Sequence, residues 1–177
     1  MGEGYFTDAC KKFMHDPEAV GALSHSVPLA SLSFPDAFDT IYIAGGHGCC
    51  NPDFYTSSVL ISAIETTLFA GKVVAVVCHG PMVLAQCKNA SGAPLVSGLS
   101  VTGFSNSEEA AVGCTDKVDF LIQTKFEEQG GNFEKADDWT SGVVSDKVGD
   151  GTLVTGQNPQ SSEACAKLVI DCLGTTS

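Results

Sequence analysis

The amino-acid sequence predicts an α/β protein organised around a mostly parallel sheet. Val73–Val77 is a short run of small, mostly β-branched apolar residues that leads into the turn sequence Cys78–Pro81. Such a run is typical of a strand buried on both faces, as in a parallel sheet. A strand over 38–44, a glycine-rich turn, an amphipathic helix and then Val73–Val77 make a βαβ unit, whose strands are parallel and joined by a right-handed crossover. A length of 177 residues suits one domain, which we expect to span residues 1–177.

The elements before the second strand are predicted from turn and cap signals. Pro17 favours a helix over 17–23, because proline is tolerated in a first helical turn. β-Branched and aromatic residues predict the strand over 38–44. Ser57 or Ser58 can cap the crossover helix that follows.

The rest of the chain alternates short apolar segments with amphipathic helices. Pro81 is placed to begin a helix directly after Cys78, and Ser105 with Glu108 forms a capping box at the start of another helix. The remaining elements expected are helices over 81–88, 107–112, 116–129 and 161–173, short apolar segments near 95–96 and 100–102, and strands at 133–135, 143–145 and 153–155.

Composition excludes several classes of partner. The formal net charge of −12 and the isoelectric point near 4.4 argue against nucleic acid and anionic membrane surfaces. No apolar segment approaches the roughly 20 residues that a membrane-spanning helix needs. The N-terminus lacks the basic and apolar regions of a signal peptide, and the eight cysteines are scattered without a CxxC motif. We therefore expect a reducing, intracellular compartment.

Cys78 lies at the predicted strand-to-helix turn, which is the position of a nucleophile elbow. A positive helix end would lower the pKa of the thiol there and expose the sulfur at the carboxyl edge of the sheet. The alternative is a buried structural cysteine, the commoner role of a free cysteine. Because Gly45–Gly46 ends the neighbouring parallel strand, both turns would face one cleft.

Several groups near this cleft could assist a reactive thiol. The Gly46 amide and the amide of His79, which follows the cysteine, could donate to a developing oxyanion. The His79 imidazole could orient the thiol or take its proton, and an acidic residue holding the imidazole would complete a triad. Glu108 and Glu109 lie in a first helical turn, where their alternative role is to complement the helix dipole.

Four motifs resemble, in the same order, the PfpI superfamily, which has the class I glutamine amidotransferase-like fold. They are Ile41–Gly48, Ala75–Pro81, Val101–Glu109 and Leu153–Pro159. The last two narrow the resemblance to the branch of glutathione-independent glyoxalases (glyoxalase III, D-lactate dehydratase), which also includes heat-shock chaperones and reported protein deglycases. The resemblance covers nearly the whole chain from Tyr5 onward. It implies a flavodoxin-like three-layer sandwich, a homodimer, and a cytoplasmic location with the nucleus as a second site.

The resemblance also implies roles for individual residues. The family's nucleophilic cysteine corresponds to Cys78 and its histidine to His79, while the acidic partner falls on Glu109, with Glu108 as the other register. Gly46 and the amide of His79 correspond to the oxyanion hole. In the family the thiolate adds to the aldehyde of methylglyoxal to give a hemithioacetal, a proton shift yields an enediol, and hydrolysis releases D-lactate. No metal or organic cofactor is needed, and the expected substrate is a small aldehyde, methylglyoxal or glyoxal.

The sequence departs from the family's pattern at its beginning. The family begins with a strand, a helix and a second strand, which are absent here, so the strand over 38–44 would lie at a sheet edge. The absent segment carries a glutamate that hydrogen-bonds the reactive cysteine and serves as its acid/base. Neither Glu3 nor Glu18 sits in a matching motif, so no replacement is assigned.

Two other functions are open on the sequence alone. A non-catalytic chaperone or redox sensor of the same fold would use Cys78 as an oxidisable thiol. An amidase-type enzyme would hydrolyse a small amide. Cys49 and Cys50, just past the glycine turn, are interpreted as packing residues, with a place in the cleft lining as the alternative.

Overall fold

The computed structural model describes residues 7–174, which divide into two compact units after Leu32. The first unit holds helices α1 (Asp8–Met14) and α2 (Pro17–Ser24). Asp16 separates the two helices, and its side chain caps α2 by accepting hydrogen bonds from backbone amides of the first turn. The helix predicted over 17–23 is thereby confirmed.

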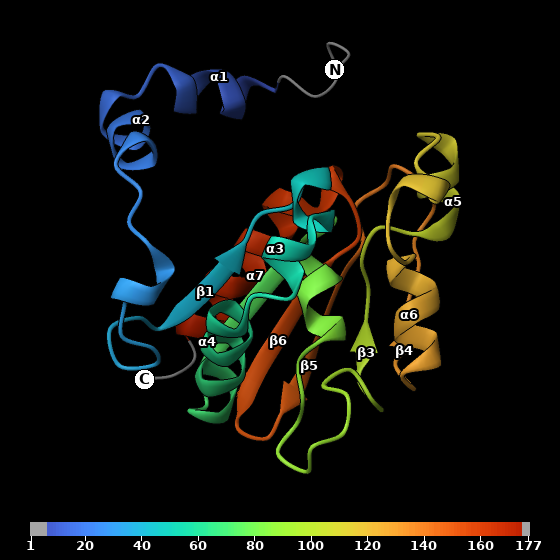
Figure 1. The fold of residues 1–177 in the computed structure, drawn as a ribbon. Helices are drawn as coiled ribbons and strands as arrows, with labels where there is room; N and C mark the ends of the chain where they lie inside the picture. Colours follow the sequence, from blue (N-terminus) through green and yellow to red (C-terminus); the bar gives the residue numbers. More distant parts are fainter. Residues whose placement is uncertain (1–6, 175–177) are drawn as a thin grey trace. The chain divides into compact units, whose positions relative to one another are not determined.

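The second unit is built on a four-stranded sheet with the order β1-β2-β6-β5. Its strands are β1 (Thr40–Ile43), β2 (Val73–Val77), β5 (Val143–Val148) and β6 (Gly151–Gly156). β1, β2 and β6 are parallel, and β5 runs antiparallel to β6 (Figure 1). The predicted βαβ unit is confirmed. Within the described residues β1 pairs on one side only, as expected for an edge strand.

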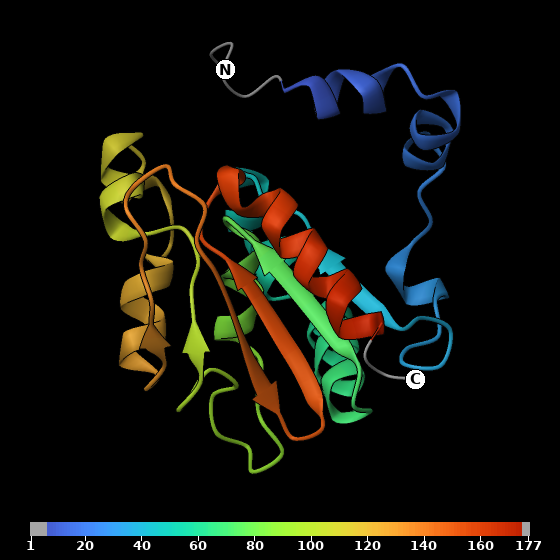
Figure 2. The ribbon, with the colours of Figure 1, turned by 180° about the vertical axis from the view of Figure 1, so that it is seen from behind.

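Helices cover both faces of this sheet, which gives the predicted three-layer sandwich. α4 (Ser58–Phe69) lies on one face and α7 (Ser162–Gly174) on the other (Figures 1 and 2). Ser57 caps α4 by accepting a hydrogen bond from a first-turn amide. Every residue of β2 is buried. The core cluster under α7 consists of Val73, Ala75, Val154, Cys165 and Val169.

A smaller layer lies beside β5 (Figure 1). It contains a two-stranded parallel sheet, β3 (Ser100–Val101) with β4 (Asn132–Phe133), and the helices α5 (Asn106–Ala111) and α6 (Ile122–Glu128). The capping box predicted at Ser105 is present, and it begins α5. β4 is shorter and earlier than the strand predicted at 133–135.

The segment after β2 is a 3-10 helix, η4 (Gly80–Ala85), and the α-helix predicted over 81–88 is wrong. All six residues of η4 are buried. Their apolar composition is compatible with either kind of helix, so the sequence does not reveal whether each amide bonds the carbonyl three or four residues earlier. The chain turns away at Cys87, whose carbonyl accepts the amide of Leu95.

The helix predicted over 116–129 begins later than expected, at Ile122 of α6. Asp116 belongs instead to a separate 3-10 turn, and Asp119 accepts a hydrogen bond from the Tyr55 hydroxyl. This tertiary contact holds the intervening residues outside the helix. Tyr55 ends a short helix that the sequence did not reveal, α3 (Pro52–Tyr55).

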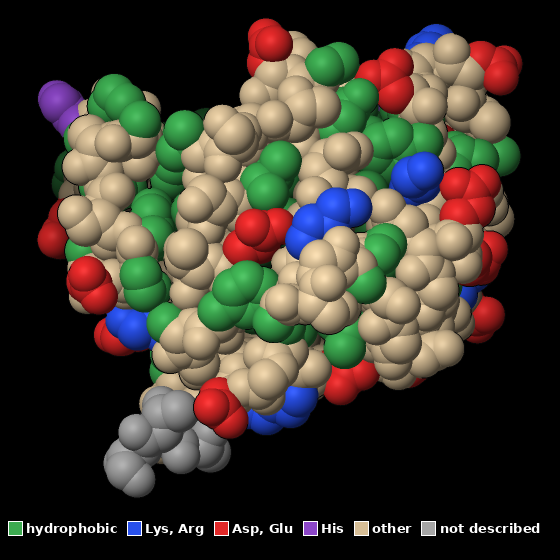
Figure 3. All heavy atoms as spheres, turned by 60° about the horizontal axis from the view of Figure 1, so that its bottom comes forward, with side chains coloured by type: hydrophobic (Ala, Val, Ile, Leu, Met, Phe, Trp, Pro, Cys, Tyr) green, Lys and Arg blue, Asp and Glu red, His purple; other side chains and the backbone are tan. Residues whose placement is uncertain are grey.

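The surface carries charges of both signs. Figure 3 shows one face, on which the lysines among the described residues lie in small separate groups between acidic and hydrophobic side chains. Over residues 7–174, the structure contains no helix that is both long and apolar enough to cross a membrane.

Candidate active site

Cys78 occupies a strained turn at the carboxyl end of β2. Its φ is +61°, a left-handed conformation that is uncommon for a residue with a side chain. The neighbouring loop approaches closely, because a Cβ on Gly45 would lie 2.5 Å from the Cβ of Cys78. Only glycine fits at that position. The predicted elbow is therefore present, although it leads into a 3-10 helix and not into an α-helix.

The elbow brings two chain neighbours into contact. The Sγ of Cys78 lies 3.3 Å from the Nδ1 of His79, and the Nε2 of His79 lies 2.7 Å from the Oε2 of Glu109. Because a carboxylate can only accept, Nε2 carries the hydrogen, and Nδ1 keeps a lone pair toward the thiol. All three residues are buried. The structure thus brings together Cys78, His79 and Glu109 in the order that a triad requires.

The pKa of the Cys78 thiol differs from the one expected from the sequence. Burial raises its pKa to about 11, although hydrogen bonds from the backbone amides of Gly46 and His79 act in the opposite direction. The predicted lowering of the pKa is therefore wrong, because desolvation outweighs the favourable amides. The same two amides are the predicted oxyanion donors, and both hydrogen-bond the sulfur of Cys78.

His79 is set up to accept a proton. Burial lowers the pKa of its imidazole, and the hydrogen bond to Glu109 acts against that lowering. The ring is therefore neutral near pH 7, which leaves Nδ1 free to take the thiol proton.

Aromatic rings line the open side of the triad. The centre of the His79 ring lies 4.0 Å from that of His47 and 4.3 Å from that of Phe104, with the ring planes tilted by 39° and 38°. The indole of Trp139 meets Phe104 edge-on at 5.8 Å. The rings of His47 and Phe104 are themselves 5.9 Å apart, so the three rings form one aromatic cluster around the imidazole. His47 is also the second partner of Glu109, with its Nε2 2.9 Å from Oε1.

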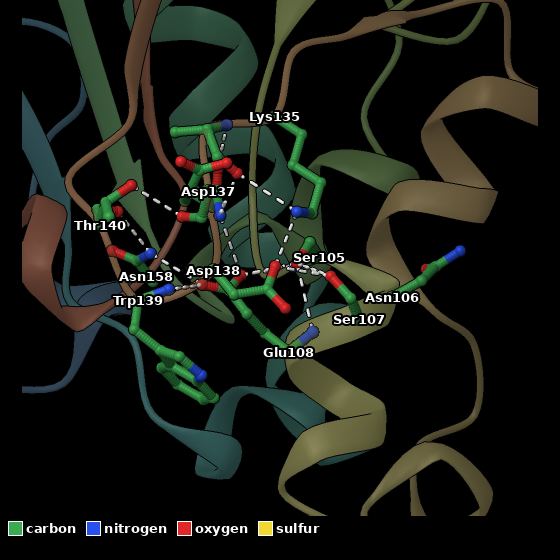
Figure 4. Close-up of polar contacts among 12 residues, drawn as sticks. Ser105, Asn106, Ser107, Glu108, Lys135, Asp137, Asp138, Trp139, Thr140 and Asn158 are labelled. Carbon is green, nitrogen blue, oxygen red and sulfur yellow. Dashed lines mark hydrogen bonds and ion pairs between the residues drawn. The ribbon is translucent and has the colours of Figure 1, made fainter.

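Glu108 lies next to Glu109 in sequence but belongs to a different network. Its carboxylate accepts five hydrogen bonds, from the amide and hydroxyl of Ser105, the Trp139 amide and the side chains of Gln157 and Asn158. These donors hold its pKa below the usual range even though burial opposes them. In Figure 4 Glu108 reaches from α5 toward Asn158 and the Trp139 backbone, while the indole ring points away from the polar contacts.

The cysteines after the glycine turn have different environments. Cys49 is buried, and its thiol donates to the carbonyl of Ala44 at 3.5 Å, as a packing residue would. Cys50 is half-buried, and burial, with the charge of Glu109 as a further cause, raises its pKa to about 12.

Sequence reasoning did not assign His47, Phe104 or Trp139 to this region. Phe104 could have been predicted near the site, because it belongs to the motif Val101–Glu109. In the structure its amide donates a hydrogen bond to the carbonyl of Cys78. Trp139 comes from a loop far along the chain and gives no periodic signal. Its contact with the site arises from tertiary structure alone.

Together, the fold and the site define an α/β protein with a buried cysteine on a nucleophile elbow. The family model described as DJ-1/PfpI matches residues 25–171, and the chain belongs to the DJ-1/PfpI family.

Individual relatives carry names that specify an activity. The chain is 32% identical over 158 residues to "Probable glutathione-independent glyoxalase hsp3104" of Schizosaccharomyces pombe, covering 87% of this chain and 69% of that protein. It is 34% identical over 143 residues to "Glyoxalase 3" of Candida albicans, covering 77% of this chain and 58% of the relative. The crystal structure of glyoxalase III from Candida albicans superimposes with a TM-score of 0.82 at 28% identity, covering 93% of this chain and 70% of that one.

Proposed function

We propose that the chain is a glutathione-independent glyoxalase that converts methylglyoxal, or a similar small aldehyde, into the corresponding hydroxy acid. The observation that carries the proposal is the series of contacts from Cys78 through His79 to Glu109, with two backbone amides directed at the same sulfur. The names of the relatives support the substrate class, since they are called glyoxalases.

The first chemical step is addition of the thiol to the aldehyde. Because burial raises the pKa of Cys78 to about 11, the resting sulfur is protonated and needs a base. As the S–C bond forms, the thiol proton passes to Nδ1 of His79 and then to the former carbonyl oxygen, which gives a hemithioacetal. Glu109 stabilises the transient imidazolium, and the amides of Gly46 and His79 offer donors for the developing oxyanion.

The later steps move a proton between two carbons and add water. The proton leaves the former aldehyde carbon, which gives an enediol, and a proton returns at the neighbouring carbon, which gives a lactyl thioester. Water then cleaves the thioester, releasing D-lactate and the Cys78 thiol. The net reaction adds one water to methylglyoxal, so no oxidant or reductant is consumed.

The redox-sensor alternative has less support. Cys78 is only 7% exposed, and its pKa is raised, whereas oxidisable sensor cysteines are exposed and have low pKa values. The homodimer, the single domain over residues 1–177, and the cytoplasmic or nuclear location stay predictions.

The test is D-lactate release from methylglyoxal in buffer without glutathione. We expect the wild-type chain to release D-lactate, and Cys78→Ala and Cys78→Ser to release none. Cys10→Ala, which removes an exposed thiol on α1, serves as the matched control and should retain turnover. A folded wild-type chain without turnover, or a Cys78→Ala variant as active as the wild type, would contradict the proposal.

A further inference from the structure

Three possible metal ligands converge at the open edge of the triad. A ring nitrogen of His47, a carboxylate oxygen of Glu109 and the Sγ of Cys114 all lie within 4.8 Å of one another. The His47 side chain is 46% exposed, whereas that of Glu109 is only 4% exposed. The three atoms therefore lie where solvent meets the buried site.

The end of α5 explains why Cys114 faces Glu109. The amide of Gly113 donates to the carbonyl of Ala110, and the amide of Cys114 donates to the carbonyl of Glu109. With Gly113 at a φ of +67°, this is the Schellman arrangement. In this arrangement the residue two positions past the helix cap, here Cys114, packs its side chain against the residue whose carbonyl its amide bonds, here Glu109. That pair is usually apolar. Here it is a thiol and a carboxylate, so local backbone geometry fixes two of the three donors.

The donor set has the chemistry of a zinc site. One imidazole nitrogen, one carboxylate oxygen and one thiolate are each common ligands of Zn²⁺, and three protein ligands with an open fourth position are usual where water also binds. A neutral imidazole with two anionic ligands balances the charge of a divalent ion. Tetrahedral ligands lie about 3.3–3.6 Å apart at normal Zn–N, Zn–O and Zn–S lengths. The His47–Glu109 separation of 2.9 Å is shorter than that spacing, and no separation among the three atoms exceeds 4.8 Å, so small shifts of the side chains would bring all three to it.

We infer that His47, Glu109 and Cys114 bind one zinc ion at the rim of the active site, and that the ion slows turnover. The ion would bind Oε1 of Glu109, whose other oxygen, Oε2, holds the Nε2 hydrogen of His79 at 2.7 Å. Binding would draw the carboxylate toward the ion and lengthen the hydrogen bond by which Oε2 orients the His79 ring toward the Cys78 thiol. Zinc binding itself is independent of the proposed glyoxalase activity, whereas its inhibitory effect rests on that activity.

Metal titration of the full chain tests the binding part without any substrate. We expect the wild type to take up one Zn²⁺ per chain by calorimetry. Co²⁺ as a spectroscopic probe should give a thiolate-to-metal charge-transfer band. In Cys114→Ala the band should disappear, and Zn²⁺ affinity should fall at least about tenfold. The matched control is Cys50→Ala, which removes another half-buried thiol near Glu109 and should keep both signals.

His47→Gln keeps the inference testable if Cys114→Ala does not fold. It should weaken Zn²⁺ binding to a similar extent. Wild-type binding that is absent, or that survives unchanged in both ligand variants, would overturn the site.

The inhibitory part is tested by adding Zn²⁺ to the D-lactate assay. We expect Zn²⁺ to lower the activity of the wild type relative to the same protein without zinc, and to leave Cys114→Ala at its own zinc-free activity. Equal inhibition of both would overturn the regulatory role. A chain that binds Zn²⁺ through Cys114 but never releases D-lactate would contradict the proposed function while leaving the metal site standing.

Discussion

Glu108 and Glu109 are neighbours on α5, with 0% and 3% of their surfaces exposed, yet their carboxylates face different parts of the molecule. Glu108 is surrounded by neutral donors that tie α5 to the loop containing Trp139 and to the residues after β6. Glu109 faces two imidazoles at the cysteine site. Both side chains are buried, so the difference between the roles of the two carboxylates comes from their hydrogen-bond partners. One carboxylate holds the fold, and the other serves the proposed chemistry.

The largest stability effect should come from Glu108→Gln. The variant keeps the shape of the side chain, but it removes the charge from the hydrogen bonds and turns an NH₂ group toward donors such as the Trp139 amide. We expect the free energy of unfolding to fall by about 2–4 kcal/mol. Urea denaturation measures the change.

The matched variant for this comparison is Glu109→Gln. It loses contacts to only two side chains, one of them half-exposed, so we expect a decrease of no more than about 1 kcal/mol. Equal destabilisation by the two substitutions would break the distinction between the two carboxylates.

The acid dependence of stability should report the structural role of Glu108. The pKa of Glu108 is lower in the folded state than in the unfolded state, where it is about 4.3. At pH values between these two pKa values the unfolded state therefore binds more protons than the folded state. The stabilisation is therefore complete above that unfolded value and is lost as pH falls through the folded pKa. Glu108→Gln should flatten the slope of unfolding free energy against pH there by up to about 1.4 kcal/mol per pH unit. An unchanged slope would mean that Glu108 does not gain these hydrogen bonds on folding.

A smaller effect should appear in tryptophan fluorescence. Trp139 is the single tryptophan of the chain, and its amide donates to Glu108 at 2.9 Å. Its φ of +62° is an uncommon conformation that this contact helps to hold. We expect acrylamide quenching to increase modestly in Glu108→Gln and to stay at the wild-type level in Glu109→Gln. Increased quenching in both variants would show that the loop depends on the triad as well.

The sequence predicts those features that depend on local signals. The buried strand Val73–Val77 and the capping box at Ser105 follow from composition and spacing, and the structure confirms both. Cys78 was identified as the elbow residue because turn residues follow a strand directly. The contact of Glu109 with His79 came from the family resemblance, because spacing alone did not distinguish it from Glu108.

The features that the sequence missed depend on tertiary surroundings. The raised pKa of Cys78 results from burial, which no local pattern reports. The hydrogen bonds of Glu108 come from residues up to 50 positions away in the chain, so its structural role could not be read from its own helix. The later start of α6 results from the contact of Asp119 with Tyr55.

The division of roles between the two carboxylates is tested most directly by comparing kcat/KM for D-lactate release in Glu108→Gln and Glu109→Gln, at a temperature where both variants are folded. Glu109→Gln removes the charge that supports His79 as a base, so we expect a loss of roughly 10²–10⁴-fold. Glu108→Gln should stay within about tenfold of the wild type, because its carboxylate reaches the site only through positioned neighbours. A Glu109→Gln variant that keeps wild-type activity, or a larger loss in Glu108→Gln, would contradict the assignment.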